Sequence, residues 1–295
     1  MLAFCLAACA GSAPPAPAPA VKAPASTAEL LRSATIDGIY ADKAVTLIDG
    51  VYEGASHAEG GASRPTVRLL EMLTASGELD GAPGGEVVAL LAESSGGSGE
   101  RIYLAVFQSQ NAVLVNMATA LLGDRVKLRR LDIDAGTIVL DVIQAAPGEP
   151  MCCGTQLARK TYRLESGRLK LVASQAVGRL SLAAIARLEW VLDELNGKAP
   201  AQGSQPPTFT IQGDTASGFA GCNRFSGPIN ETAPGKVSLG DLAATMMACE
   251  GTQMSIEDEY LRSLRRVTSY TFLAGRLALT WEGGGERGLL LFRRK

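Results

Sequence analysis

The chain has 295 residues, and its 28 lysines and arginines against 30 aspartates and glutamates leave a formal net charge of −2. A near-neutral chain with 46% hydrophobic residues is atypical of disordered proteins and of proteins that bind nucleic acid through a basic surface. Its single histidine disfavours most histidine-dependent enzymes. The length favours two domains, each able to bury its own core.

The N-terminus is an apolar run that ends in Leu6-Ala7-Ala8-Cys9. The run is about half the length of a membrane-spanning helix, which needs about 20 residues. It resembles the lipobox of bacterial lipoproteins, which implies that residues 1–9 are the remnant of a signal sequence and that Cys9 is acylated. No lysine or arginine precedes Cys9, unlike in most secretory leaders. The alternative is a frayed terminus in which Cys9 has no role.

Residues 10–28 are rich in proline and alanine, a composition that favours an extended tether over a folded core. With a lipid on Cys9, the tether would hold the folded part away from a membrane. The lipoprotein resemblance implies a bacterial cell-envelope location. Ala10 stands where inner-membrane lipoproteins commonly carry aspartate, which favours the outer membrane and a periplasmic orientation.

Residues 29–176 are predicted to form a β-rich domain, to which the sequence assigns no function. Val87–Leu91 and Ile102–Phe107 are apolar at every position, which is typical of central strands with both faces covered. Asp49-Gly50 and Ser166-Gly167 are expected to form hairpin turns, because glycine readily adopts positive φ.

The apolar alternation changes parity near Arg129. Val126 and Leu128 occupy even positions, whereas Leu131 and Ile133 occupy odd ones. Since a shift of one residue turns every side chain of a strand to the opposite face, the pattern predicts a β-bulge near Arg129.

Residues 186–295 contain a tryptophan strand, then Gly221-Cys222-Asn223-Arg224, then Thr245-Met246-Met247-Ala248-Cys249, then a helix with an acidic start. This arrangement resembles the META domain of the HslJ-like heat-inducible lipoproteins. The resemblance implies an antiparallel sheet with one packed helix, so that the whole chain is mainly β with an α+β C-terminal domain. It also implies a non-catalytic, structural or binding role in envelope stress tolerance or antibiotic resistance.

The helix is also predicted from the residues themselves. Ser255 is expected to cap it, with Asp258 completing an approximate capping box. Ala274-Gly275 is expected to be a hairpin turn, and Leu289–Phe292 an internal strand beneath the helix. The predicted apolar face of the helix consists of Ile256, Tyr260, Leu261, Leu264 and Val267.

Four cysteines besides those of the leader allow three pairings in an oxidising compartment. A disulfide between Cys222 and Cys249 is favoured over reduced thiols. For the adjacent Cys152 and Cys153, two free thiols are favoured over a vicinal bridge, which would need a strained ring. A zinc site is disfavoured because no C-x₂-C repeat is present.

Asn223 and Arg224 are candidates for a recognition loop, since arginine presents a donor fork suited to carboxylate or phosphate. The favoured alternative is a polar cap that pins two strand ends. Met246 and Met247 are expected to pack in the core.

Other functions remain open. One is a hydrolase that uses acidic residues such as Glu78, Asp80 and Glu86. These residues lie in a loop that resembles a calcium-binding loop, but it matches that pattern poorly. Another is an inhibitor or partner-binding protein with an exposed apolar patch. No cofactor and no metal are expected. The expected partners are the membrane, through the anchor, and an unknown envelope protein or small ligand, while the oligomeric state stays open.

Overall fold

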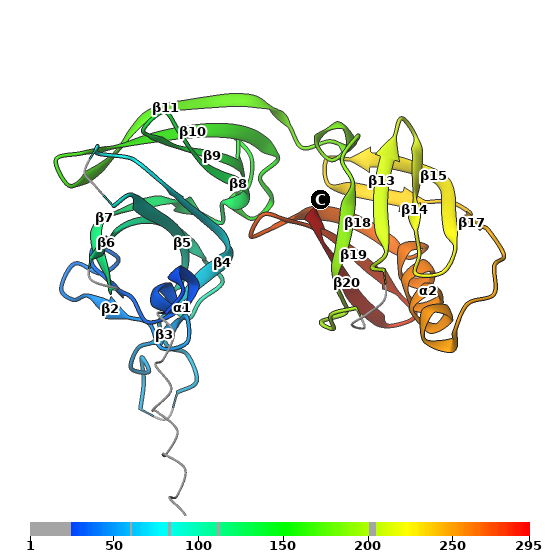
Figure 1. Ribbon diagram of the computed structural model, residues 1–295, viewed down its shortest axis with the longest axis horizontal. Coiled ribbons are helices and arrows are strands. Elements are labelled where there is room, and N and C mark those ends of the chain that lie inside the picture. The colour runs from blue at the N-terminus through cyan, green and yellow to red at the C-terminus, as the bar shows by residue number, and fades with distance from the viewer. Residues whose placement is uncertain (1–24, 60, 82–83, 111–112, 201–204) are drawn as a thin grey trace, which may run out of the picture.

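The computed structural model describes residues 25–59, 61–81, 84–110, 113–200 and 205–295, which form two β-rich bodies (Figure 1). Cys9 and most of the predicted tether lie outside the described residues. Within these ranges, no helix is both long and apolar enough to span a membrane.

The N-terminal body is built from antiparallel sheets (Figure 1). One sheet has the order β3 (Val51–Glu53), β4 (Thr66–Gly77), β5 (Glu86–Ser94), β6 (Arg101–Gln110) and β7 (Val113–Asp124). A second has the order β11 (Arg168–Arg179), β10 (Gln156–Glu165), β9 (Thr137–Gln144) and β8 (Lys127–Asp134). The short strands β1 (Thr35–Ile36) and β2 (Val45–Thr46) pair with each other, after helix α1 (Thr27–Arg32).

Strands β5 and β6 are covered on both faces, as their apolar sequences predict. Val88, Leu90 and Leu104 pack into the cluster between the two larger sheets. Leu91 and Phe107 pack on the opposite face, in a cluster shared with α1, β1 and β2. The sequence did not predict α1, whose first turn is capped by Ser26 and Glu29.

The predicted bulge is confirmed by a register shift between Leu128 and Arg130 in the pairing of β8 with β9. The turn at Ser166-Gly167 joins β10 to β11 as expected. At Asp49-Gly50 both residues have the positive φ of a hairpin turn, at 50° and 81°. Ile48 and Val51 exchange two backbone hydrogen bonds across the turn, at 2.8 and 3.0 Å, so the turn closes as expected, but only over one antiparallel bridge. The longer pairings of the flanking strands lie elsewhere, β2 with β1 and β3 with β4.

The C-terminal body is an antiparallel sheet that closes on itself through a pairing of β14 with β15, next to one packed helix (Figure 1). The mainly β fold with an α+β C-terminal domain is therefore confirmed. The sheet order is β14 (Thr215–Phe219), β13 (Thr208–Gln212), β12 (Trp190–Leu195), β20 (Glu286–Arg294), β19 (Arg276–Gly283), β18 (Val267–Leu273), β16 (Lys236–Leu239), β15 (Arg224–Ala233) and β17 (Ala243–Ala244).

The helix α2 (Gly251–Leu264) begins four residues before the predicted cap. The Ser255 prediction is wrong: its hydroxyl donates to the Gly251 carbonyl at 2.9 Å, an interaction that serine makes inside a helix. The predicted internal strand is confirmed, since β20 lies between β12 and β19. The ring of Tyr260 on α2 lies 6.3 Å from that of Phe292 on β20.

The two bodies touch where the turn between β18 and β19 reaches β8 (Figure 1). The backbone amide of Gly275 donates to the carbonyl of Leu128 at 2.9 Å. Beside this bond, the Arg129 guanidinium lies 4.9 Å from the centre of the Phe272 ring, and it donates to the Ala184 carbonyl at 3.2 Å. The bulge therefore supplies both a carbonyl and a cation to the contact.

Candidate functional site

The two sequence motifs of the C-terminal body meet in space. A disulfide joins Cys222 to Cys249, with their Cα atoms 6.0 Å apart. Beside it, the backbone amide of Asn223 donates to the carboxylate of Glu257 on α2 at 2.6 Å, and the side-chain amide of Asn223 donates to the other carboxylate oxygen at 3.1 Å. Both Asn223 and Glu257 are buried. The helix and the motif are thus fixed to one another.

The side chain of Asn223 also holds the segment that precedes Cys249. Its carbonyl oxygen accepts from the Thr245 hydroxyl at 2.8 Å and from the Met247 amide at 2.7 Å, and its amide donates to the Met247 carbonyl at 3.2 Å. These bonds occupy the polar atoms that a recognition residue would offer to a ligand. Arg224 differs, because it is exposed and its backbone amide donates to the Thr245 hydroxyl.

We call residues 245–249 the methionine loop. The prediction that its methionines pack in the core is wrong: Met246 is 98% exposed and Met247 is 58% exposed. The physical reason is that the chain leaves the sheet after β17, and Asn223 takes the place of a neighbouring strand as the hydrogen-bonding partner. The loop therefore presents two thioether side chains on a backbone that is held at both ends.

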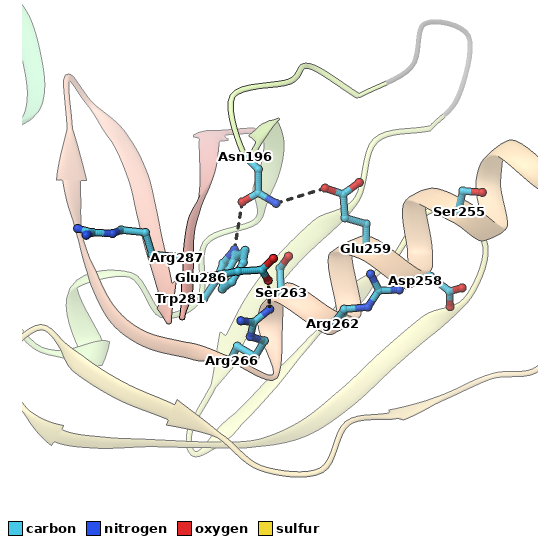
Figure 2. A pocket seen from close by; sticks show the side chains of 10 residues that line it. All are labelled: Asn196, Ser255, Asp258, Glu259, Arg262, Ser263, Arg266, Trp281, Glu286 and Arg287. Carbon is cyan, nitrogen blue, oxygen red and sulfur yellow. Dashed lines mark hydrogen bonds and ion pairs between the residues drawn. The ribbon is translucent and has the colours of Figure 1, made fainter. Parts of the chain in front are cut away.

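An open groove of about 720 Å³ lies beside α2 (Figure 2). At its centre, Asn196 accepts from the Trp281 indole and donates to Glu259, at 3.1 and 3.2 Å. The Arg266 guanidinium stacks 4.1 Å from the centre of the Trp281 ring. The groove is lined by Asn196, Ser255, Asp258, Glu259, Arg262, Ser263, Arg266, Trp281, Glu286 and Arg287.

The charges of this groove are mixed. Arg266 pairs with Glu286 at 3.5 Å, whereas Arg262 and Arg287 make no ion pair with any residue that the structure describes. In Figure 2, Arg287 points away from the other side chains. The groove therefore carries both paired and unpaired charges.

A second cavity, of about 490 Å³, lies between the two bodies. It is lined by parts of β3, β4, β8 and the β18–β19 hairpin. Among the cations that line it, Arg276 is paired with Asp193 at 2.9 Å and Glu194 at 2.6 Å. Burial lowers the pKa of Lys127 at its edge.

The acidic residues of the hydrolase alternative lie in and after the loop between β4 and β5. Glu86 is buried, and its carboxylate accepts from the Leu79 amide at 2.6 Å. Burial is the largest cause that raises the pKa of Glu86, and the charges of Asp80 and Glu78 add to it. The cavities described above are lined by other residues, and no group of three or more acidic, histidine or cysteine side chains in the described chain could hold a metal. The one histidine, His57, is exposed, with its Nε2 2.8 Å from the Ser95 carbonyl oxygen.

The adjacent Cys152 and Cys153 are bonded to each other, in the short 3₁₀ turn η1 (Met151–Cys153). The expectation of two free thiols is therefore wrong. The turn places consecutive cysteines on an exposed connection, where neither side chain is buried.

Glu257, the buried partner of Asn223, is not among the residues that the sequence analysis singles out. A signal was present: Glu257 precedes Leu261 and Leu264 by four and seven positions, which puts it on the apolar face of the helix. A charged residue on that face indicates a buried polar partner.

Comparisons with known proteins identify the C-terminal part. Residues 183–295 match the family model of the META domain. A solution structure of a protein from Burkholderia xenovorans is 30% identical and covers 43% of this chain and 97% of its own, with a TM-score of 0.31. A second solution structure is 22% identical over 39% of this chain and 94% of its own, with a TM-score of 0.32. No curated protein matches the chain.

Proposed function

We propose that this chain, which carries a META domain at residues 183–295, is a lipid-anchored protein of the bacterial cell envelope that binds a partner instead of turning over a substrate. Its role would be structural or binding support in envelope stress tolerance or antibiotic resistance. The META domain family is not a known family of enzymes.

The methionine loop carries the binding part of this proposal. Its backbone is held by Asn223 at one end and by the disulfide of Cys249 at the other. Methionine is flexible and polarizable, so exposed methionines adapt to apolar partner surfaces. A fixed backbone lowers the entropy that ordering the loop on binding would cost. Arg224, exposed beside the loop, adds a donor fork for an acidic group on the partner.

The location rests on two separate supports. Disulfides persist in oxidising compartments such as the bacterial periplasm, and both cysteine pairs of the described chain are bonded. The anchor rests on the sequence alone, through Cys9 and the proline-rich residues that follow it.

Affinity capture tests the binding role. The intact chain is used to capture partners from the envelope of its own host, beside a Met246→Gln/Met247→Gln variant. We expect the variant to keep its fold and to lose most of the captured partner. Met72→Gln is the matched control, because Met72 is 53% exposed on β4 in the other body. Equal capture by the loop variant and the wild type would contradict the proposal.

Mass spectrometry of the membrane fraction tests the anchor. A diacyl or triacyl group on an N-terminal Cys9 is expected, and Cys9→Ser is expected to release the protein into the soluble fraction. Recovery of an unprocessed, soluble wild-type chain would rule out the lipid anchor, while leaving the capture experiment unaffected.

A further inference from the structure

We propose that Cys152 and Cys153 form a reversible thiol–disulfide exchange site whose co-substrate is an external dithiol. This inference is independent of the proposed partner-binding role. It follows from where the bond lies, what it contributes to the fold, and what holds the surrounding turn.

A stabilising role explains this bond poorly. A disulfide stabilises a protein mainly by restricting the unfolded chain, and the effect grows with the length of the loop that it closes. Cys152 and Cys153 are consecutive, with their Cα atoms 3.8 Å apart, so the bond encloses no intervening residue. Both residues are exposed, and neither belongs to a core cluster.

The turn is held by bonds that do not involve sulfur. The Glu149 carboxylate accepts from the amides of Ala146 and Thr155, both at 2.9 Å, and from the Thr155 hydroxyl at 2.6 Å. It also pairs with Arg179 on β11. The carboxylate thus ties the two ends of the turn to each other and to the sheet.

Backbone contacts fix the position of the cysteines within the turn. The amide of Cys153 donates to the Pro150 carbonyl at 3.1 Å. A Cβ on Gly154 would lie 2.3 Å from the Ala145 nitrogen, so only glycine allows this close approach. Because none of these contacts involves a sulfur atom, the two thiols should stay adjacent and exposed after reduction, ready to form the bond again.

The exchange balances without any further reagent. A thiolate of the external dithiol attacks one of the two sulfurs, the bond between Cys152 and Cys153 breaks, and the displaced cysteine thiolate takes up a proton. The second thiolate of the reagent then attacks the mixed disulfide and releases the other cysteine, which is protonated in turn. The protein gains two electrons and two protons, and the reagent becomes a disulfide.

The bond between Cys222 and Cys249 provides an internal comparison. Cys222 is only 3% exposed, Cys249 is half-buried, and that bond spans 27 positions of sequence. Reducing it also gives up the restraint that it places on a long loop of the unfolded chain, a stabilisation that a bond between consecutive residues hardly provides. The Cys222–Cys249 bond should therefore need a higher ratio of reduced to oxidised reagent than the Cys152–Cys153 bond.

Graded reduction tests the inference. The full-length oxidised chain is equilibrated with dithiothreitol at a series of ratios of reduced to oxidised reagent, quenched with acid, alkylated and mapped by peptide mass. We expect Cys152 and Cys153 to be reduced at a ratio of reduced to oxidised reagent at least tenfold lower than the ratio that reduces Cys222 and Cys249. The circular dichroism spectrum should not change when the first pair is reduced. That pair should bond again in excess oxidised reagent. Reduction of both pairs at one ratio, or failure of the bond to form again, would overturn the proposal.

Two variants separate exchange from a structural role. Cys153→Ser leaves one thiol at Cys152, which should form a mixed disulfide with oxidised glutathione in the folded protein. Cys152→Ser/Cys153→Ser should melt within about 2 °C of the wild type, since the turn is held by Glu149. A double variant that fails to fold, or a Cys152 thiol that stays unreactive, would each contradict the inference.

Discussion

Asn223 and Glu257 lie 34 positions apart in the sequence and are joined by two hydrogen bonds, one from the backbone amide and one from the side chain of Asn223. Through this pair, α2 holds the motif that in turn holds the methionine loop. A buried side chain of α2 therefore controls the shape of the surface that the exposed methionines form.

Glu257→Ala is expected to lower the free energy of unfolding by about 2–4 kcal/mol, because it leaves two buried donors of Asn223 without an acceptor. Glu257→Gln keeps one acceptor oxygen and should cost about half as much. Urea unfolding measures both values. Asp258→Ala is the control, since Asp258 is an exposed neighbour on the same helix. Equal effects at positions 257 and 258 would show that the hydrogen bonds to Asn223 do not stabilise the fold.

Cys222→Ser/Cys249→Ser is expected to destabilise the protein by about 3.5 kcal/mol, the value that the loop-entropy model gives for a bond across 27 positions. The matched control is Cys152→Ser/Cys153→Ser, for which the same model predicts a much smaller loss. Unfolding in urea without reductant compares the two. A larger loss for the adjacent pair would show that the bond between Cys152 and Cys153, and not the bond between Cys222 and Cys249, is structural.

Stability should fall in acid through Glu149. Hydrogen bonds from the Ala146 amide and from the Thr155 hydroxyl and amide lower the pKa of Glu149 to about 2. Because the folded state holds the ionised form, this contribution is complete above pH 4.5 and is lost as the pH falls toward 2. The free energy of unfolding of Glu149→Gln should therefore change less between pH 5 and pH 2 than that of the wild type. Parallel pH profiles for the two proteins would refute this assignment.

The contact between the two bodies should depend on Arg129. Arg129→Ala removes a cation above the Phe272 ring and a donor to the Ala184 carbonyl. We expect it to lower the free energy of unfolding by about 1–2 kcal/mol. In a double-mutant cycle with Phe272→Leu, a coupling of about 1 kcal/mol is expected. Arg130→Ala is the control, because Arg130 is exposed and pairs with Asp132 on its own strand. Additive effects of Arg129→Ala and Phe272→Leu would mean that the two side chains do not interact.

Much of the fold could be predicted because it follows from local periodicity. The change of parity between Leu128 and Leu131 was enough to locate the bulge, and the apolar positions of β5 and β6 were enough to place them centrally. The start of α2 was not predictable in this way: serine is favoured at a helix N-terminus, but its hydroxyl can also bond a carbonyl one turn earlier inside a helix, as Ser255 does.

The candidate site depended on contacts between distant segments, which periodicity does not encode. Met246 and Met247 look like core residues in sequence, yet both are exposed in a loop in which Asn223 binds the backbone of Met247. Residue type did suggest Asn223 as a polar pin, but it did not identify Glu257 as its partner. The neighbouring positions of Cys152 and Cys153 in the sequence showed that the two could bond to each other. The ion pair of Glu149 with Arg179, which helps to hold the turn around them, is seen only in the folded structure.

The bulge makes strand β8 sensitive to the deletion of a single residue. Since the extra residue sets which side of the sheet the Arg129 side chain faces, a single-residue deletion there would realign β8 with β9 and turn the arginine away from Phe272. The Leu128 carbonyl, which accepts a hydrogen bond from the Gly275 amide, would move with it. One amino acid in a strand of the first body thus sets two of the contacts that join it to the second body.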